Sequence, residues 1–251
     1  MIDISIKNLF LKHQNSFKTV LKDISFALPA NNIYTIIGKN GSGKSTLIKS
    51  LTGLLDKRFY TLEGEILYNS KNILSWDKNE ILEFRRKKIK YVFQDAVNSF
   101  DHLKKIGYYF SKLVNNNEET EELLKFFLLP ESNKLFKLYP YEVSGGMAQR
   151  ISLVLSLLTH PEIIILDEPT SGIDSPVASL VLLKLKEFAS INNNSVLLVT
   201  QDLLFAKRIS DKIAFLKDGS LTNFLPVSEF FNNAANENLD SFLNSFTEIS
   251  K

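Results

Sequence analysis

The segment at positions 38–45 has the residues of a loop that wraps phosphate groups. It reads Gly-Lys-Asn-Gly-Ser-Gly-Lys-Ser and fits the pattern G-x-x-x-x-G-K-S. Glycines let backbone N–H groups curl around phosphate oxygens, and the N-terminus of a following helix adds positive potential. In such a loop Lys44 reaches the β- and γ-phosphates, and the Ser45 hydroxyl is a ligand for Mg²⁺. The residues predicted to hold the phosphates of a nucleotide are Gly38, Lys39, Asn40, Gly41, Ser42, Gly43, Lys44, Ser45 and Thr46.

Two adjacent carboxylates, Asp167 and Glu168, form the second candidate group. They follow the apolar run at 163–166, which predicts a strand buried on both faces. The end of such a strand delivers both carboxylates to the ligand edge of a parallel sheet. Asp167 would hold Mg²⁺ directly or through water, and Glu168 would be the general base that orients and polarises the attacking water. The pattern alone also fits a strand that runs into a turn, but the phosphate loop favours the functional interpretation.

A third group, Ser144, Gly145 and Gly146, opens a predicted helix with a hydroxyl cap followed by bare N–H groups, which is another potential anion site. A single domain does not need two such sites for one nucleotide. The sequence at 143–150, Val-Ser-Gly-Gly-Met-Ala-Gln-Arg, resembles the signature of ABC-type ATPases. The resemblance implies ATP and Mg²⁺ as cofactors. It also implies an ATP sandwich, in which this segment binds the nucleotide held by a second ATPase subunit.

The resemblance covers about residues 9–219, with every motif in family order. It implies that Gln94 is the Q-loop glutamine, which contacts Mg²⁺ and water. It also implies that positions 171–174 form the D-loop, which ends at Asp174. The residues implied to lie around the metal ion are Ser45, Gln94 and Asp167.

Segments 93–100 and 139–142 are similar to the same regions of the oligopeptide, dipeptide and nickel importer ATPases. That subfamily usually has proline where Ala96 stands. The chain also stops at residue 251, short of the C-terminal extension of many peptide-importer members. This length favours the shorter nickel or metallophore type. We therefore expect the ATP-hydrolysing subunit of a bacterial importer for peptides, nickel/cobalt or metal–chelator complexes.

The resemblance also implies partners and a location. The expected partners are a second ATPase subunit (a different chain, otherwise a second copy), two membrane permeases and, indirectly, an extracellular solute-binding protein. The expected location is the cytoplasmic face of the cell membrane. A non-transport ABC-type ATPase, such as a translation or DNA-repair factor, is the alternative. It is less favoured because such proteins typically carry two ATPase halves or a long coiled-coil insertion.

One position departs from the family pattern. After the strand predicted at 196–200 the family presents a histidine that contacts the γ-phosphate and the catalytic glutamate, whereas this chain has Gln201. A glutamine amide can donate a hydrogen bond but cannot carry a positive charge or move a proton. Losing a well-aimed donor costs about 100- to 1000-fold in rate at comparable sites. Two interpretations stay open: Gln201 substitutes adequately, or this chain's own site is slow and the chain pairs with a different, competent subunit.

These residues need a scaffold that brings distant loops together. Strand-like runs alternate with helix-like segments, which predicts a mainly parallel sheet wrapped by helices. The expected fold class is α/β: a P-loop NTPase core with an antiparallel β subdomain and an α-helical subdomain, as in ABC ATPases. The predicted division is a nucleotide-binding core at 1–94, a helical subdomain with the signature at 95–158, the second part of the core at 159–225 and a tail at 226–251.

The individual elements are predicted from hydrophobic period and from turn residues. The predicted strands lie at 2–6, 24–28, 33–37, 63–68, 90–93, 163–166, 196–200, 213–216 and 221–225. The clearest predicted helices lie at 44–52, 118–129, 144–159 and 175–191. The candidates for the family's adenine-stacking aromatic residue are His13, Phe10 and Phe17.

Composition excludes several other classes of protein. The formal net charge is +2, so we expect no nucleic-acid partner. The chain has no cysteine, which excludes disulfides, thiolate zinc sites and cysteine nucleophiles. Its three histidines lack metal-ligand spacing. The N-terminus does not read as a signal peptide, and no apolar run approaches the roughly 20 residues that span a bilayer. Any work at a membrane would therefore need another protein as anchor.

Overall fold

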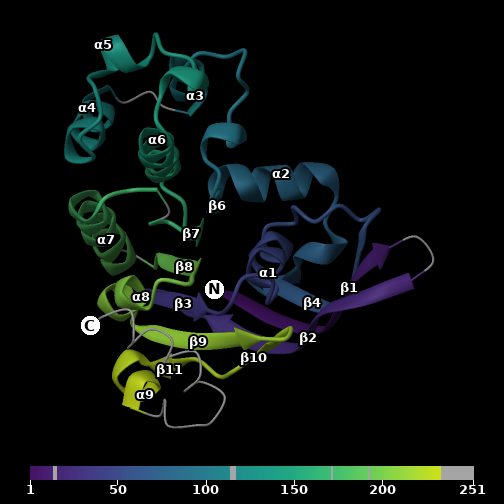
Figure 1. Cartoon of the computed structure of the whole chain (residues 1–251). Coiled ribbons are helices and arrows are strands. Elements are labelled where there is room, and N and C mark those ends of the chain that lie inside the picture. Colours follow the sequence, from purple (N-terminus) through teal and green to yellow (C-terminus); the bar gives the residue numbers. More distant parts are fainter. Residues whose placement is uncertain (14–15, 114–116, 171, 192, 233–251) are drawn as a thin grey trace.

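The apolar runs of the sequence form the inner strands of a parallel sheet. The computed structural model describes residues 1–13, 16–113, 117–170, 172–191 and 193–232 (Figure 1). The main sheet has the strand order β10-β9-β3-β8-β7-β6, with β11 also paired to β9. Neighbours among β9, β3, β8, β7 and β6 run parallel. The bounds are β3 (Asn32–Ile37), β6 (Ile89–Val92), β7 (Ile163–Asp167), β8 (Ser195–Thr200), β9 (Lys212–Lys217), β10 (Ser220–Leu221) and β11 (Leu225–Pro226).

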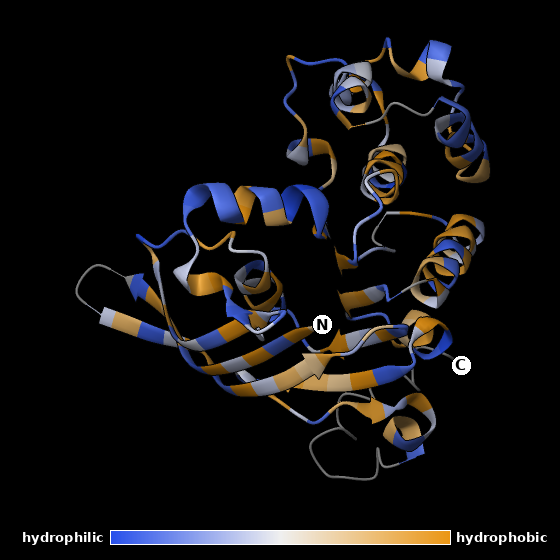
Figure 2. Ribbon diagram, turned by 180° about the vertical axis from the view of Figure 1, so that it is seen from behind, coloured by the Kyte–Doolittle hydropathy of each residue, from blue (hydrophilic) through white to orange (hydrophobic). Residues whose placement is uncertain are grey.

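The alternating N-terminal sequence forms a separate antiparallel sheet with the order β2-β1-β4-β5. Ile2, Ile4 and Ile6 are at most 2% exposed, as expected when every second side chain of a strand faces inward. Figure 2 shows this alternation as orange and blue bands along the strands. The bounds are β1 (Ile2–His13), β2 (Ser16–Leu28), β4 (Tyr60–Tyr68) and β5 (Lys71–Asn72).

The two faces of the parallel sheet belong to different apolar cores. On β8, Val196 and Leu198 pack into the core that includes α6 and α7, whereas Leu197 and Val199 pack into the core that includes α1 and the antiparallel sheet. Helices α1 and α6 therefore cover opposite faces of the sheet (Figure 1). The bounds are α1 (Lys44–Leu51), α6 (Gly145–Leu157) and α7 (Ser175–Ser190).

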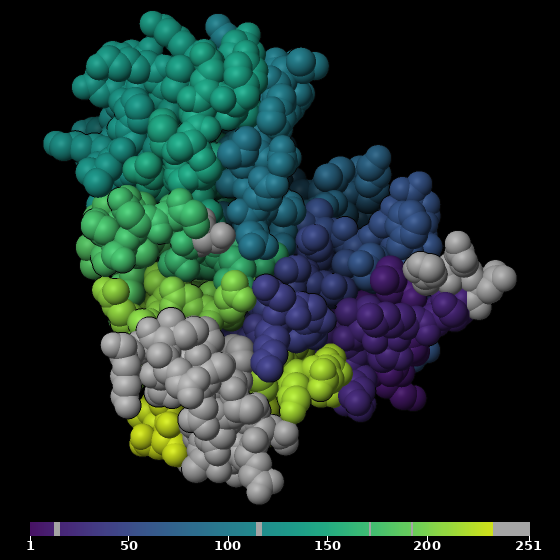
Figure 3. All heavy atoms as spheres, in the orientation of Figure 1, coloured from purple at the N-terminus to yellow at the C-terminus, as the bar shows by residue number. Residues whose placement is uncertain are grey.

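Short helices form a layer around α6, apart from the antiparallel sheet. Phe110, Leu124 and Phe127 are buried there and join the same core as α6. Figure 3 shows a notch in the surface between this layer and α2. The bounds of the layer are η2 (Val97–Ser99), α3 (Ile106–Leu113), α4 (Asn117–Phe126), α5 (Ser132–Leu135) and η3 (Pro140–Glu142). The remaining helices are η1 (Ile73–Ser75), α2 (Lys78–Lys87), α8 (Leu203–Ile209) and α9 (Val227–Asn232).

Some element boundaries differ from the predictions for local reasons. The strand predicted at 221–225 is wrong, because only β10 and β11 form, with a gap between them. In that gap the Thr222 hydroxyl accepts the Phe215 N–H at 2.9 Å and replaces a backbone partner. The helix predicted to continue to residue 129 ends at 126, because Leu128 has a positive φ of 53°. The strand predicted at 90–93 lies one residue earlier.

Two further expectations concern the membrane and the tail. Within the described ranges, no helix is both long and apolar enough to cross a bilayer. The tail predicted at 226–251 starts at the last residue of β11 and includes α9, and its residues 233–251 lie outside the described residues.

Candidate nucleotide site

The predicted site residues follow the carboxyl ends of adjacent parallel strands. Ile37 of β3 pairs with Thr200 of β8, and Val199 of β8 pairs with Asp167 of β7. Parallel strands end at the same sheet edge, so the phosphate loop, the two carboxylates and the segment at Gln201 emerge side by side. The structure thus brings together residues more than 160 positions apart in the sequence.

The phosphate loop is closed by its own lysine. Lys44 is buried, and its Nζ donates hydrogen bonds to the carbonyl oxygens of Gly38 and Lys39 at 2.8 and 3.1 Å. Burial lowers the pKa of Lys44, and the negative charges of Glu168 and Asp167 partly offset this effect. The ammonium is thus held in the loop, where a phosphate oxygen could take the place of a carbonyl.

Glycine is required in this loop for two different reasons. A Cβ at Gly38 would lie only 2.4 Å from the carbonyl oxygen of Leu216, so the backbone approaches too closely for any side chain. Gly41 and Gly43 have positive φ angles of 79° and 106°, which favour glycine. Ser42 Oγ is buried and, within the described part of the chain, has no hydrogen-bond partner. Such an orphaned hydroxyl fits a loop that receives a polar ligand.

Asp167 is held from two sides by hydroxyl groups. Ser45 Oγ donates to its Oδ1 at 3.2 Å, and Tyr91 OH donates to its Oδ2 at 2.8 Å. Burial raises the pKa of Tyr91, and the charge of Asp167 raises it further by a smaller amount. The phenol therefore remains a donor at physiological pH. Among the residues that the structure describes, no cluster of three or more His, Asp or Glu side chains could hold a metal ion. A cation beside Ser45 and Asp167 would therefore need oxygens from the nucleotide and from water as well.

Glu168 has one oxygen that is held and one that is not. Its Oε2 accepts hydrogen bonds from Thr200 Oγ1 at 2.9 Å and from the Gln201 backbone N–H at 3.1 Å. Its Oε1 is buried, lies 3.9 Å from Lys44 Nζ and lacks a hydrogen-bond partner among the described residues. Burial raises the pKa of this carboxyl, and the two donors to Oε2 oppose that shift. The carboxylate is thus fixed through one oxygen, and the other can accept a proton.

The backbone around Glu168 explains its orientation. Glu168 has a positive φ of 49°, and its N–H donates to the carbonyl oxygen of Val199 at 2.9 Å. Gln149 on α6 donates from Nε2 to the carbonyl oxygen of Glu168 at 3.4 Å. A left-handed non-glycine residue is held there by its neighbours, as is common at functional sites.

Gln201 contributes to this site through its backbone. Its N–H binds Glu168, while the residue itself is exposed. Asp202 then caps α8, since its Oδ1 accepts the Phe205 N–H at 2.9 Å. The backbone contact does not depend on the residue type, so the effect of replacing histidine by glutamine lies in the side chain alone.

The predicted signature residues cap α6. Ser144 Oγ accepts the Met147 N–H at 3.2 Å, as an N-cap does. Ser144 and Gly145 are exposed, and a Cβ at Gly145 would meet nothing within 4 Å. A Cβ at Gly146 would lie 3.1 Å from the carbonyl oxygen of Gly172 in the predicted D-loop. The open space at Gly145 is therefore available to a ligand from outside this chain.

Two further predicted residues lie at the edges of the site. Asp174 caps α7, because its Oδ1 accepts the Val177 N–H at 3.2 Å. Gln94 is exposed and follows β6 by two residues.

Of the proposed adenine-stacking residues, Phe17 is 63% exposed and makes an edge contact with Phe10. The side chain of His13 lies outside the described residues.

Sequence reasoning missed Thr200, Tyr91 and Gln149. The first two occupy positions near the carboxyl ends of parallel strands, which is the one signal that could have identified them. Gln149 lies within the signature segment at 143–150, but nothing in its position indicates that its amide reaches the backbone carbonyl of Glu168.

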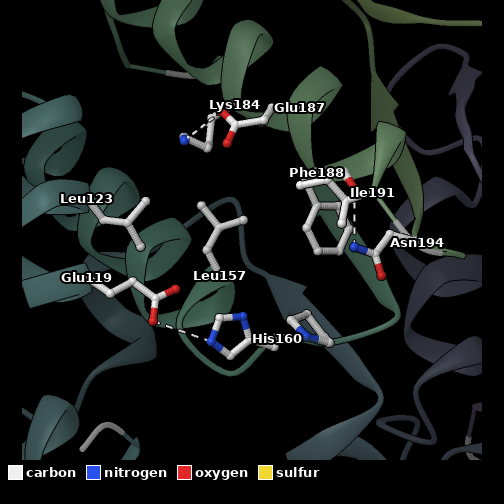
Figure 4. A pocket seen from close by; sticks show the side chains of 10 residues that line it. Glu119, Leu123, Leu157, His160, Lys184, Glu187, Phe188, Ile191 and Asn194 are labelled. Atoms are coloured by element: carbon white, nitrogen blue, oxygen red, sulfur yellow. Dashed lines mark hydrogen bonds and ion pairs between the residues drawn. The ribbon is translucent and has the colours of Figure 1, made fainter. Parts of the chain in front are cut away.

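Two cavities lie away from these residues. One has a volume of about 330 Å³, and charged groups around it are paired: His160 Nε2 lies 3.4 Å from Glu119, and Lys184 Nζ lies 2.7 Å from Glu187 (Figure 4). The other has a volume of about 540 Å³ and includes Trp76 in its wall. Neither includes a residue of the phosphate loop or of the carboxylate pair.

Known proteins resemble this chain in both sequence and structure. The family model described as ABC transporter matches residues 21–171. The oligopeptide transport ATP-binding protein AmiE of Streptococcus pneumoniae is 28% identical over 241 residues, which cover 92% of this chain and 68% of the relative. The oligopeptide transport ATP-binding protein OppD of Escherichia coli is 31% identical over 210 residues, which cover 80% of this chain and 62% of that relative. The chain thus spans about two thirds of the length of these relatives.

A solved structure of the ATP-binding cassette MJ0796, dimeric in a post-hydrolysis state with ADP and Pi, has a TM-score of 0.77 and 26% identity. The match covers 90% of this chain and 99% of that one. The chain therefore belongs to the ABC transporter family, and it is an ATPase of that family. The predicted fold class and the resemblance to the oligopeptide and dipeptide importer ATPases are confirmed.

Proposed function

We propose that this chain binds and hydrolyses ATP as the energy-supplying subunit of a bacterial importer. The observation that carries the proposal concerns the buried Oε1 of Glu168, which forms an ion pair with Lys44 at 3.9 Å but has no hydrogen-bond partner in the described part of the chain. The relatives named for oligopeptide transport support peptides as the cargo. Nickel, cobalt or metal–chelator complexes are the other cargo class proposed.

The chemistry follows from the side chains at the sheet edge. Backbone N–H groups of the phosphate loop and Lys44 would bind the phosphates, because both offer positive potential in a buried setting. Glu168 Oε1 would accept a proton from the water that attacks the γ-phosphate, while Thr200 and the Gln201 N–H hold Oε2 in place. Release of the proton would return the carboxylate to its ionised state.

Mg²⁺ fits the donors present. Ser45 Oγ and Asp167 are hard oxygen donors, already within hydrogen-bond distance of each other. We propose that these two residues hold the cation together with phosphate oxygens, with Gln94 near its water shell. When bound, the cation would neutralise charge on the phosphates. Ser42 Oγ and Glu168 Oε1 are buried and, across the residues that the structure describes, accept or donate no hydrogen bond, so both fit the polar nucleotide that accompanies the cation.

A complete site requires a second subunit in this proposal. The exposed Ser144 and Gly145, at an open helix N-terminus, would bind the nucleotide of a partner ATPase, with Gly146 and Asp174 supporting that surface. Because Gln201 stands in place of histidine, we propose an asymmetric pair in which this chain's own site is slow. Its signature would complete a competent site on the partner.

The remaining partners follow from the same proposal. Two membrane permeases would bind the ATPase pair at the cytoplasmic face of the cell membrane, and an extracellular solute-binding protein would deliver cargo to them. ATP would close the pair, and hydrolysis would reopen it. No nucleic acid takes part.

Mixing the two ATPases tests the proposal. The chain is purified alone and together with the companion ATPase encoded beside it, and ATP binding and ATP turnover are measured for each. We expect slow turnover by the lone chain, cooperative turnover by the mixture, and faster turnover by the lone chain after Gln201→His. Robust, cooperative turnover by the lone chain would refute the asymmetric pair. Absence of ATP binding in every sample would refute the proposed function itself.

A further inference from the structure

A tyrosine outside every predicted motif contacts the carboxylate of the proposed metal site. Tyr91 OH donates to Asp167 Oδ2 at 2.8 Å, opposite the Ser45 hydroxyl on Oδ1. The strand register accounts for the contact. Tyr91 pairs with Ile165 on β7, and Asp167 lies two residues further along the strand, on the same face. The hydroxyl therefore reaches diagonally along the sheet to the strand end.

The position of the Tyr91 ring is fixed by packing as well as by this hydrogen bond. Its centroid lies 4.3 Å from that of Phe93, with the rings 76° apart in an edge-to-face contact. Phe93 is 37% exposed and directly precedes Gln94. This packing keeps the Tyr91 hydroxyl within hydrogen-bond distance of Asp167, because the Tyr91 ring cannot rotate without displacing Phe93.

We propose that Tyr91 is a positioning residue that orients the Asp167 carboxylate for Mg²⁺. With Oδ2 held by the phenol, rotation about the Cβ–Cγ bond is restricted and Oδ1 stays beside the Ser45 hydroxyl. Asp167 is 5% exposed, so water cannot readily replace the phenol as a donor. Removing a group that hydrogen-bonds to a metal ligand lowers metal affinity about 10- to 100-fold. This inference rests on the proposed function, since it concerns the same ATP site.

The chain offers a closely matched control. Tyr91→Phe removes only the hydroxyl that binds Asp167. Tyr68→Phe removes a hydroxyl that donates to a carboxylate in the same way, to Glu162 Oε2 at 2.6 Å. Glu162 precedes β7, at the opposite end of that strand from Asp167, so this control leaves the nucleotide edge intact.

The test measures metal binding rather than turnover. The full chain carries Glu168→Gln so that ATP is not consumed, and free Mn²⁺ is titrated by electron paramagnetic resonance in the presence of ATP. We expect Tyr91→Phe to weaken Mn²⁺ binding about 10-fold or more. With Tyr68→Phe, the Mn²⁺ affinity should stay within about twofold of that of the chain that carries Glu168→Gln alone. ATP binding in EDTA, followed with a fluorescent analogue, should stay unchanged in both. Tyr91→Met keeps an apolar side chain in the same space and replaces Tyr91→Phe if that variant folds poorly.

A double-mutant cycle separates positioning from a general effect. If Tyr91 acts through Asp167, Tyr91→Phe should add less than about twofold in an Asp167→Asn background. Unchanged Mn²⁺ affinity in Tyr91→Phe would overturn the inference, and so would an undiminished effect in Asp167→Asn. Failure of the unsubstituted chain to bind ATP would refute the proposed function instead.

Discussion

The hydroxyl of Thr200 is expected to set the pH at which Glu168 becomes an effective base. It donates to Glu168 Oε2 at 2.9 Å, and Thr200 is fully buried. Thr200→Val keeps the shape of the side chain and removes the donor. A hydrogen bond to a charged group contributes about 1.5–3 kcal/mol, and one pKa unit corresponds to about 1.4 kcal/mol. The Gln201 N–H still binds Oε2, so we expect the pKa of Glu168 to rise by about one unit.

Loss of the Thr200 hydroxyl should reduce turnover on the acid side of the pH profile. Glu168 must be ionised to accept a proton, so turnover falls as the pH drops through its pKa. Burial already raises that pKa, and Thr200 opposes the rise. Without the hydroxyl, the acid limb of the kcat–pH profile should therefore move to higher pH by about one unit. Turnover at saturating Mg-ATP is measured between pH 5 and 9.

A threonine on the neighbouring strand provides the control. Thr35 on β3 is fully buried, and its hydroxyl is hydrogen-bonded to Ser210, away from Glu168. Thr35→Val should leave the acid limb where it is. An acid limb that stays in place in Thr200→Val would refute the reasoning, because Glu168 would then not be the titrating base. An equal shift in both variants would assign the effect to the sheet as a whole.

Three further substitutions test the packing and charge of the site. Gly38→Ala should abolish binding of a fluorescent ATP analogue, because the added Cβ would lie 2.4 Å from the Leu216 carbonyl oxygen; retained affinity would show that the loop can shift. Glu168→Gln should raise the melting temperature at pH 8 but not at pH 4. The folded-state pKa is raised, so the ionised carboxylate costs stability only above the unfolded value, and equal shifts at both pH values would contradict this. Arg150→Met should lower the free energy of unfolding by about 1–3 kcal/mol in urea, because the guanidinium donates to the Phe127 carbonyl oxygen at 2.8 Å; no change would mean that water replaces this contact.

The sequence could predict the parts of the site that consist of consecutive residues. The phosphate loop and the pair Asp167–Glu168 each depend on consecutive residues after an apolar strand, so their pattern is visible without a fold. Parallel strands then place them at one edge, as expected. The buried strands and the helices α1, α4, α6 and α7 were likewise predicted by hydrophobic period, whereas α2, α3, α5, α8 and α9 were not predicted.

Contacts between strands could not be predicted in this way. Tyr91 and Thr200 touch the two carboxylates only because of strand register and side-chain direction, which no local pattern records. The strand predicted at 221–225 failed for a similar reason, since the Thr222 side chain takes over a backbone hydrogen bond. The role of Gln201 stays a prediction, because its backbone contact to Glu168 would be the same for histidine.

The assignment of Glu168 as the base is tested by comparing ATP binding and turnover in the unsubstituted chain, Glu168→Gln, Gln201→His and the double variant. We expect all four proteins to bind ATP. We further expect Gln201→His to raise turnover on the order of 100-fold, and Glu168→Gln to remove this gain completely. A double variant that hydrolyses ATP as fast as Gln201→His would contradict the assignment of Glu168 as the base.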